Sequence, residues 1–106
     1  MAAQVLYLTT TGRQTGLPRE IEIWFVESEG KLYLLAEKFQ EAHWVRNIEN
    51  NPRVKVRLDG RECEAAARVL DPERDRSARD LAQRLGREKY GWGEGLPVEI
   101  VPERAR

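Results

Sequence analysis

The sequence is poor in the features that mark secreted, membrane and nucleic-acid-binding proteins. It contains one cysteine, Cys63, among 106 residues, so an internal disulfide is excluded. Lysine plus arginine and aspartate plus glutamate number 18 each, and this balance gives no overall positive field to attract nucleic acid or an anionic membrane. No apolar run approaches the roughly 20 residues of a membrane-spanning helix, and no segment resembles a signal peptide. We therefore expect a cytoplasmic protein that binds neither nucleic acid nor membrane.

The chain also lacks the side-chain clusters that serve metal sites and covalent catalysis. Its one histidine, His43, has no second histidine to join it, and Cys63 is expected in the core. We expect His43 at the surface or at a helix end. Neither a metal-ligand set nor a nucleophile with its base is present in the pattern, so no residue is assigned a catalytic role.

Short segments of alternating apolar and polar residues predict a mainly β protein. The segment 4–10 is rich in β-forming residues, and residues 20–25 alternate at the period of a half-buried strand. A turn at residues 27–30 then leads to an apolar run over 31–36. We expect 20–25 and 31–36 to pair as antiparallel neighbours.

The dipeptide Asp59-Gly60 favours a two-residue type I′ turn between two further strands. A turn of that length fixes which residues lie opposite one another, and it puts apolar and ionic pairs on opposite faces. The basic residues Arg53, Lys55 and Arg57 are therefore expected to stabilise the sheet and not to bind a ligand. The predicted cross-strand pairs are Val56 with Cys63, Arg57 with Glu62, and Lys55 with Glu64.

Two segments carry helical spacing. One covers about 41–50 and stops before Pro52, and the other covers about 72–89 and begins with an N-cap and a first-turn proline. The run 97–102 predicts a last strand, whose prolines suggest that it lies at an edge or ends there. About six strands and two helices favour one domain over 1–106, a small antiparallel barrel with the helices packed outside.

The most informative stretch is the loop over residues 9–19, which combines threonines, glycines and the arginines Arg13 and Arg19. Glycines let backbone N–H groups turn toward a ligand, hydroxyls add donors, and arginine binds phosphate or carboxylate through paired hydrogen bonds. The loop therefore has the chemistry of an anion site. An ordinary solvated hairpin loop has a similar composition, so both readings stay open on chemistry alone.

The loop and three later segments together resemble the deazaflavin (F420)-dependent nitroreductase and quinone reductase family, whose split β-barrels are related to FMN-binding pyridoxamine phosphate oxidase-like proteins. The resemblance runs through nearly the whole chain. The segments that carry it are Thr10-Thr11-Gly12-Arg13 with Gly16-Leu17-Pro18-Arg19, Ala36-Glu37-Lys38, Trp44 to Asn47 with Asn51-Pro52, and Leu96-Pro97-Val98 with Pro102.

The resemblance implies a six-stranded antiparallel split β-barrel that dimerises with a second copy and uses F420, or alternatively FMN. The reaction would be hydride transfer from the reduced cofactor to a small-molecule acceptor, namely a quinone, a nitro compound or an activated alkene. The implied cofactor-binding residues are Thr10, Thr11, Arg13, Arg19, Lys38 and Trp44, and the implied substrate-facing residues are Trp24, Tyr90 and Trp92. For Trp24 a position in the dimer interface is the alternative.

Two departures from the family pattern bear on these expectations. Gln14 stands where the family loop commonly has a lysine, and Phe39-Gln40-Glu41 replaces a glycine-rich insert after Lys38. The shorter loop would leave the cofactor ring more exposed. A protein that only binds or carries a flavin, a deazaflavin or a tetrapyrrole on the same barrel is therefore the alternative function.

Overall fold

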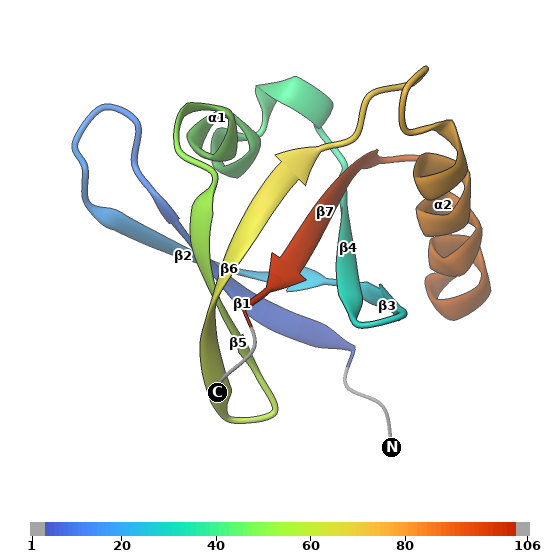
Figure 1. Ribbon diagram of the computed structural model, residues 1–106, viewed down its shortest axis with the longest axis horizontal. Coiled ribbons are helices and arrows are strands. Elements are labelled where there is room, and N and C mark those ends of the chain that lie inside the picture. Colours follow the sequence, from blue (N-terminus) through green and yellow to red (C-terminus); the bar gives the residue numbers. More distant parts are fainter. Residues whose placement is uncertain (1–3, 104–106) are drawn as a thin grey trace.

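The computed structural model describes residues 4–103, which form one sheet of seven strands with two α-helices (Figure 1). The strands are β1 (Val5–Thr11), β2 (Pro18–Trp24), β3 (Val26–Ser28), β4 (Lys31–Ala36), β5 (Arg53–Leu58), β6 (Arg61–Val69) and β7 (Leu96–Pro102); the helices are α1 (His43–Asn50) and α2 (Arg76–Tyr90), and a 3-10 turn, η1 (Phe39–Glu41), precedes α1.

The strands run in the order β2-β1-β5-β6-β7-β4-β3, with every neighbouring pair antiparallel. The sheet curls so strongly that β2 also contacts β4, which gives a half-barrel (Figure 1). The predicted mainly β split barrel with two helices is confirmed, with seven strands in place of six.

The extra strand arises where the predicted hairpin between 20–25 and 31–36 proved wrong. β2 instead pairs with β1 along its full length, and only the short strand β3 pairs with β4. The break falls at Phe25, whose buried ring enters the core. Alternation in the sequence indicates which face of a strand is buried, but it does not identify the partner strand.

The β5–β6 hairpin has the predicted register, with Val56 opposite Cys63, Arg57 opposite Glu62, and Lys55 opposite Glu64. Asp59 and Gly60 have φ values of 53° and 77°, as a type I′ turn requires. The side chains differ from the expectation in one respect, because Arg57 forms its ion pair with Glu20 of β2 at 3.3 Å. Cys63 packs partly buried against the core, and burial followed by nearby glutamates raises the pKa of its thiol.

Helix α2 begins four residues later than predicted. The carboxylate of Asp71 accepts the backbone N–H groups of Glu73 and Arg74, as an N-cap does, but residues 72–75 form a separate turn before the helix. Of the two alternatives for the prolines of β7, the strand does end at Pro102, but it lies between β6 and β4 and not at an edge. Pro97 stands near the start of the strand, and its carbonyl accepts the Leu70 N–H at 3.1 Å.

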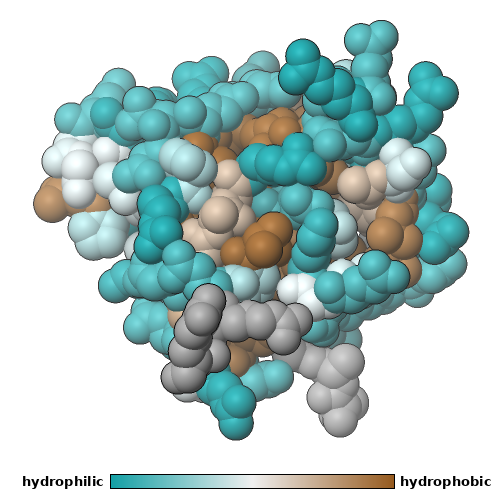
Figure 2. All heavy atoms as spheres, viewed as in Figure 1, coloured by the Kyte–Doolittle hydropathy of each residue, from teal (hydrophilic) through white to brown (hydrophobic). Residues whose placement is uncertain are grey.

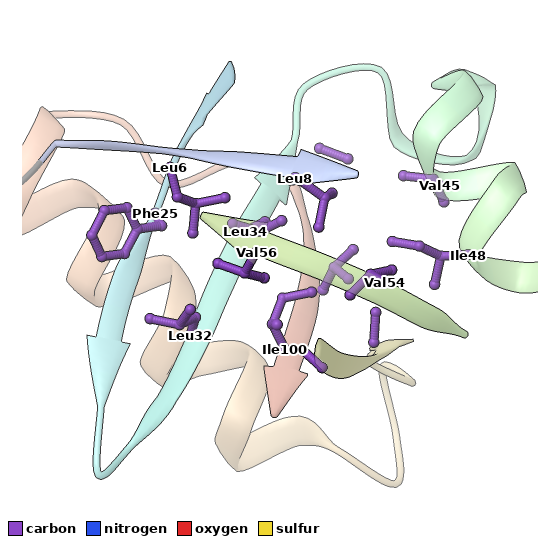
Figure 3. Close-up of a cluster of buried hydrophobic side chains, with 14 of the residues drawn as sticks. Leu6, Leu8, Phe25, Leu32, Leu34, Val45, Ile48, Val54, Val56 and Ile100 are labelled. Atoms are coloured by element: carbon purple, nitrogen blue, oxygen red, sulfur yellow. The ribbon is translucent and has the colours of Figure 1, made fainter. Parts of the chain in front are cut away.

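Two apolar clusters hold the elements together. The larger one fills the inside of the curled sheet, and α1 closes it at one end with Val45 and Ile48 (Figure 3). The smaller one lies outside the sheet, where Ala82 of α2 packs with Val26, Tyr33 and Leu70. Figure 2 shows that polar side chains cover most of one face, with small apolar areas between them. None of the helices in residues 4–103 is long and apolar enough to span a membrane.

The link between α2 and β7 packs tightly against both. A side chain at Gly93 would collide with the carbonyl oxygen of Gln83 in α2, and one at Gly95 would come within 2.9 Å of the Ala36 carbonyl oxygen. Only glycine permits these two close approaches. The link therefore lies directly on the helix and on the end of β4.

Candidate functional site

A cavity of about 620 Å³ lies between the β1–β2 loop and α1. In Figure 1 the loop extends beside the first turn of this helix. The end of β1, the loop, the start of β2 and one face of α1 supply its walls. The lining residues are Thr10, Gly12, Arg13, Gln14, Thr15, Pro18, Arg19, Glu20, Ile21, His43, Trp44 and Asn47.

The β1–β2 loop is closed at its base by its own backbone. The Gly12 N–H donates to the Leu17 carbonyl at 2.8 Å, and the Gly16 N–H donates to the Gly12 carbonyl at 2.8 Å. A side chain at Gly12 would lie 2.9 Å from the Thr15 hydroxyl oxygen, so glycine is required for this closure. The loop therefore has a defined shape at the point where Arg13 leaves it.

Arg13 is held by neutral groups only. Its backbone N–H and its Nη1 donate to Asn47 Oδ1 at 3.2 Å and 3.0 Å, and its Nη2 lies 3.3 Å from His43 Nδ1. Asn47 is buried and donates from Nδ2 to the buried Thr10 hydroxyl at 3.0 Å. Since none of these partners is charged, the guanidinium keeps its full positive charge at the cavity.

The rest of the lining adds positive charge and little negative charge. Within residues 4–103, no hydrogen bond or ion pair engages the exposed guanidinium of Arg19. Glu20 contributes the carboxylate in the lining, and Arg57 neutralises it from outside the cavity at 3.3 Å. Cations without their own counterions suit an anionic ligand, and arginine suits phosphate and carboxylate in particular.

A sequence model of the F420H(2)-dependent quinone reductase family matches residues 1–100. The chain belongs to this family. It is 27% identical to an F420-H2 dependent reductase, FDR-A, over 97% of this chain and 96% of that one, with a TM-score of 0.73. This protein is therefore a reductase whose cofactor is the deazaflavin F420.

Two further solved structures share the architecture. One is a domain-swapped dimer, 25% identical over 97% of this reductase and 82% of its own chain, with a TM-score of 0.74. The other is HutZ, a haem storage protein from Vibrio cholerae, 19% identical over 96% and 83% of the two chains, with a TM-score of 0.68. The likeness to HutZ concerns the fold alone.

The cavity of this reductase fits the charged part of F420, which carries a phosphodiester and a glutamate tail. Arg13 and Arg19 would offer separate cations to a long anionic chain, and the paired Glu20 would add little repulsion. When bound, the reduced deazaflavin supplies a hydride. Binding and orienting the cofactor fall to the protein.

The structure brings together four of the six predicted cofactor-binding residues. Thr10, Arg13, Arg19 and Trp44 all line the cavity. Thr11 is not in the lining, because successive strand residues point to opposite faces. Lys38 is also outside the lining, at the start of η1, where its carbonyl accepts the Glu41 N–H.

The three predicted substrate-facing residues lie elsewhere in the single chain. Trp24 is opposite Val5 at the far end of β2 from the loop, and its ring stacks on Tyr90 at 4.6 Å. The Tyr90 hydroxyl lies 2.6 Å from the carbonyl oxygens of Gln4 and Phe25, so this residue ties α2 to the edge of the sheet. Trp92 belongs to the close-packed link after α2.

Sequence reasoning did not assign a site role to His43 and Asn47. Both lie on α1, four residues apart, so they share one face of the helix. The spacing is visible in the sequence, but nothing there indicates that this face lies against the β1–β2 loop. His43 is, as expected, exposed at a helix end.

Proposed function

We propose that this protein transfers hydride from reduced F420 to a quinone, a nitro compound or an activated alkene, with the anionic part of the cofactor in the cavity between the β1–β2 loop and α1. The observation that carries the proposal is the pair Arg13 and Arg19, which line the cavity without a carboxylate partner. The acceptor takes the matching proton from solvent, since no residue is assigned to donate it.

Each proposed cofactor contact has a stated chemistry. Arg13 and Arg19 bind the phosphodiester and the tail carboxylates, and the Thr10 hydroxyl adds a donor, whereas Thr11 lies outside the cavity and has no contact in this proposal. Trp44, which lines the cavity, packs against an apolar part of the cofactor. Lys38 binds an end of the anionic tail that extends beyond the cavity.

We also propose that the protein acts as a homodimer. Trp24 is 51% exposed, although large aromatic residues are enriched at subunit contacts. None of Trp24, Tyr90 and Trp92 lines the cavity of its own chain, so a second copy could bring them to the acceptor. The domain-swapped dimer among the similar structures supports this arrangement. A monomeric mass in light scattering would contradict it.

The test of the cofactor site is a fluorescence titration of cofactor-free protein with F420 and, in parallel, with FMN. The double variant Arg13→Ala, Arg19→Ala should bind F420 about 100-fold more weakly, because two charge-assisted contacts are lost. A matched control removes two exposed arginines outside the cavity lining, Arg61 and Arg76, and should bind normally. Equal affinity in both variants would refute the proposed site.

Assays on the same preparation distinguish the reductase from a protein that uses FMN and from a carrier that only binds the cofactor. Oxidation of reduced F420 by menadione supports the reductase proposal, and saturation by FMN alone would reassign the cofactor. Tight binding without turnover of any acceptor would favour the carrier alternative, which the fold shared with the haem storage protein HutZ makes worth testing.

A further inference from the structure

Asn47 is a buried polar residue of the cavity whose side chain bonds to two other lining residues. It is 4% exposed, and its amide makes three hydrogen bonds, one to Thr10 and two from Arg13. Arg13 lies 34 positions away in the chain, so these bonds join α1 to the β1–β2 loop. All hydrogen bonds of this buried amide go to the β1–β2 loop and to the strand before it. The amide therefore holds the loop against α1.

The two donors of Arg13 set which way the amide faces, because both need an oxygen acceptor. Reversal of the amide would place its NH2 group against these two donors, which is unfavourable. With Oδ1 turned toward the loop, Nδ2 donates to the buried Thr10 hydroxyl, which can accept or donate and so adapts to this orientation. Asn47 therefore holds both the backbone and the side chain of Arg13, and Thr10 anchors Asn47 to β1.

This arrangement leaves part of Arg13 available to a ligand. A guanidinium carries five N–H groups, of which Asn47 takes one and the His43 ring faces another. The contact with His43 requires an unprotonated Nδ1 as acceptor, so it too leaves the positive charge of Arg13 unopposed. An arginine that is already ordered loses less side-chain entropy when it binds an anion.

We propose that Asn47 is a positioning residue for the cofactor site, and that it strengthens binding of the F420 phosphodiester by holding the Arg13 guanidinium in place. The inference rests on the proposed function, since it assumes that Arg13 binds the anionic part of F420. In this proposal Asn47 acts through Arg13 and does not contact the reacting atoms.

A double-mutant cycle tests this inference. F420 affinity is measured for the original protein, Asn47→Ala, Arg13→Ala and the combined variant, and thermal unfolding is measured for each. Asn47→Ala should weaken binding about tenfold when Arg13 is present, a coupling typical of contacting residues, and less than about twofold when Arg13 is absent. Its effect on stability should remain in both backgrounds.

The matched control is Asn51→Ala at the end of the same helix. Asn51 Oδ1 accepts the Arg53 N–H at 3.1 Å, and the residue lies outside the cavity lining. We expect lower stability and unchanged F420 affinity. If Asn47→Ala does not fold, Asn47→Ser replaces it, because the shorter hydroxyl cannot serve Thr10 and Arg13 together.

A second readout does not depend on binding. In 15N-labelled, cofactor-free protein, the Arg13 Nε–H signal should broaden or shift in Asn47→Ala, while the signal of Arg61 should not change. An unchanged Arg13 signal, or equal losses of affinity with and without Arg13, would overturn the inference alone. Absence of F420 binding by the original protein, or normal binding by Arg13→Ala, would instead overturn the proposed function on which it rests.

Discussion

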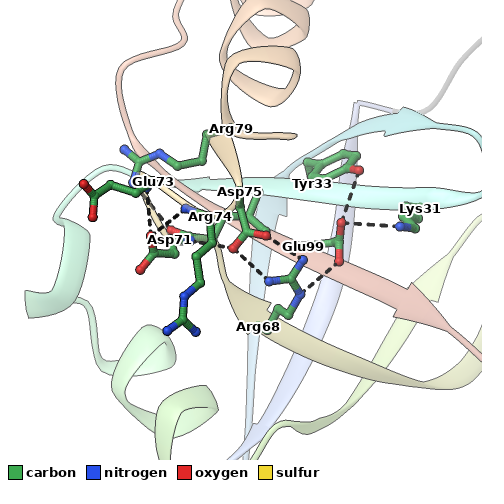
Figure 4. Close-up of polar contacts among 10 residues, drawn as sticks. Lys31, Tyr33, Arg68, Asp71, Glu73, Arg74, Asp75, Arg79 and Glu99 are labelled. Atoms are coloured by element: carbon green, nitrogen blue, oxygen red, sulfur yellow. Dashed lines mark hydrogen bonds and ion pairs between the residues drawn. The ribbon is translucent and has the colours of Figure 1, made fainter. Parts of the chain in front are cut away.

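The arginines of this reductase fall into two regions with opposite surroundings. On the outer face of the sheet, Arg68 forms two bonds to Asp75, at 2.9 Å and 3.1 Å, and a third to Glu99 at 3.3 Å (Figure 4). Glu99 is 5% exposed and also meets the Tyr33 hydroxyl and the Lys31 ammonium. At the cavity, Arg13 meets an amide and an imidazole and has no carboxylate partner.

The difference separates charges that stabilise the fold from charges that are kept for a ligand. The outer network is self-contained, since it ties the start of α2 to β4, β6 and β7 and its charges offset one another. Arg68 lowers the pKa of Asp75, and burial followed by the Glu99 charge raises the pKa of Tyr33. Within residues 4–103, no carboxylate pairs with the cavity arginines, so their charges are available to an external anion.

Removal of the network's central carboxylate should have the largest effect on stability. Glu99→Ala leaves the Tyr33 hydroxyl buried without a partner and leaves Arg68 and Lys31 without this carboxylate. Both cations are about half exposed, so we expect a loss of about 2 kcal/mol, below the range for fully buried pairs. Urea unfolding measures it, and F420 affinity should stay constant. A weaker F420 affinity in this variant would show that the outer network also affects cofactor binding, which contradicts the distinction between the two regions.

At the cavity, we expect a loss of F420 affinity with little change in stability. Arg19→Ala should weaken F420 binding about tenfold, because one charge-assisted contact is lost. The same change should alter the free energy of unfolding by less than about 0.5 kcal/mol, as for other exposed residues without partners. Titration and urea unfolding of one preparation give both values. A stability loss comparable to that of Glu99→Ala would mean that Arg19 has a structural role.

The pH dependence of stability should follow the outer network. The folded-state pKa values of Asp71 and Asp75 lie below their ordinary value, Asp71 through backbone N–H bonds and Asp75 through Arg68. Their contribution is therefore complete above the unfolded value of about 4, and it is lost as the pH falls through the lowered values. Asp75→Asn should be less stable at pH 7, and its deficit should shrink below about pH 4.

Urea midpoints of both proteins across this range measure the deficit. A difference that stays constant with pH would show that the Asp75 charge contributes nothing. Arg19→Ala serves as the control, because Arg19 belongs to the cavity and its effect on stability should not depend on pH.

The smallest expected effect is a gain in F420 affinity from a substitution in the cavity lining. Gln14→Lys restores the cation that the family loop commonly carries, at an exposed position in the lining. We expect F420 affinity to rise about threefold at low salt, with the gain falling as salt screens the charge. Gln14→Met, of similar size and without charge, is the matched control. An equal gain in both variants would attribute the effect to packing.

Local chemistry predicted the parts of the fold that short segments determine. Asp59-Gly60 identified the β5–β6 turn and its register, because a two-residue turn leaves no freedom in the pairing. The choice of partner for β2 could not be predicted, since the same alternating pattern fits β1 or β4. Helix α2 was predicted to begin at about residue 72, but Asp71 caps a separate turn over 72–75 and the helix begins at Arg76.

The candidate site was predicted in part for a similar reason. Arg13 and Arg19 stand in a loop whose composition reveals its chemistry. Asn47 and His43 join them only through the packing of α1 on the loop, a contact between segments about 30 residues apart. The family resemblance placed Trp24 and Tyr90 on the acceptor side, but in this chain their rings stack on one another and neither lines the cavity.

The close contact of Gly93 with α2 also decides where this molecule can move. The link and the helix form one packed unit, so they shift together or not at all. The β1–β2 loop is different, because residues 14–20 are exposed and its base is held by a few hydrogen bonds. Of the two, this loop is therefore the part of the molecule held less by packing, and the part that can open at lower cost to admit a long cofactor.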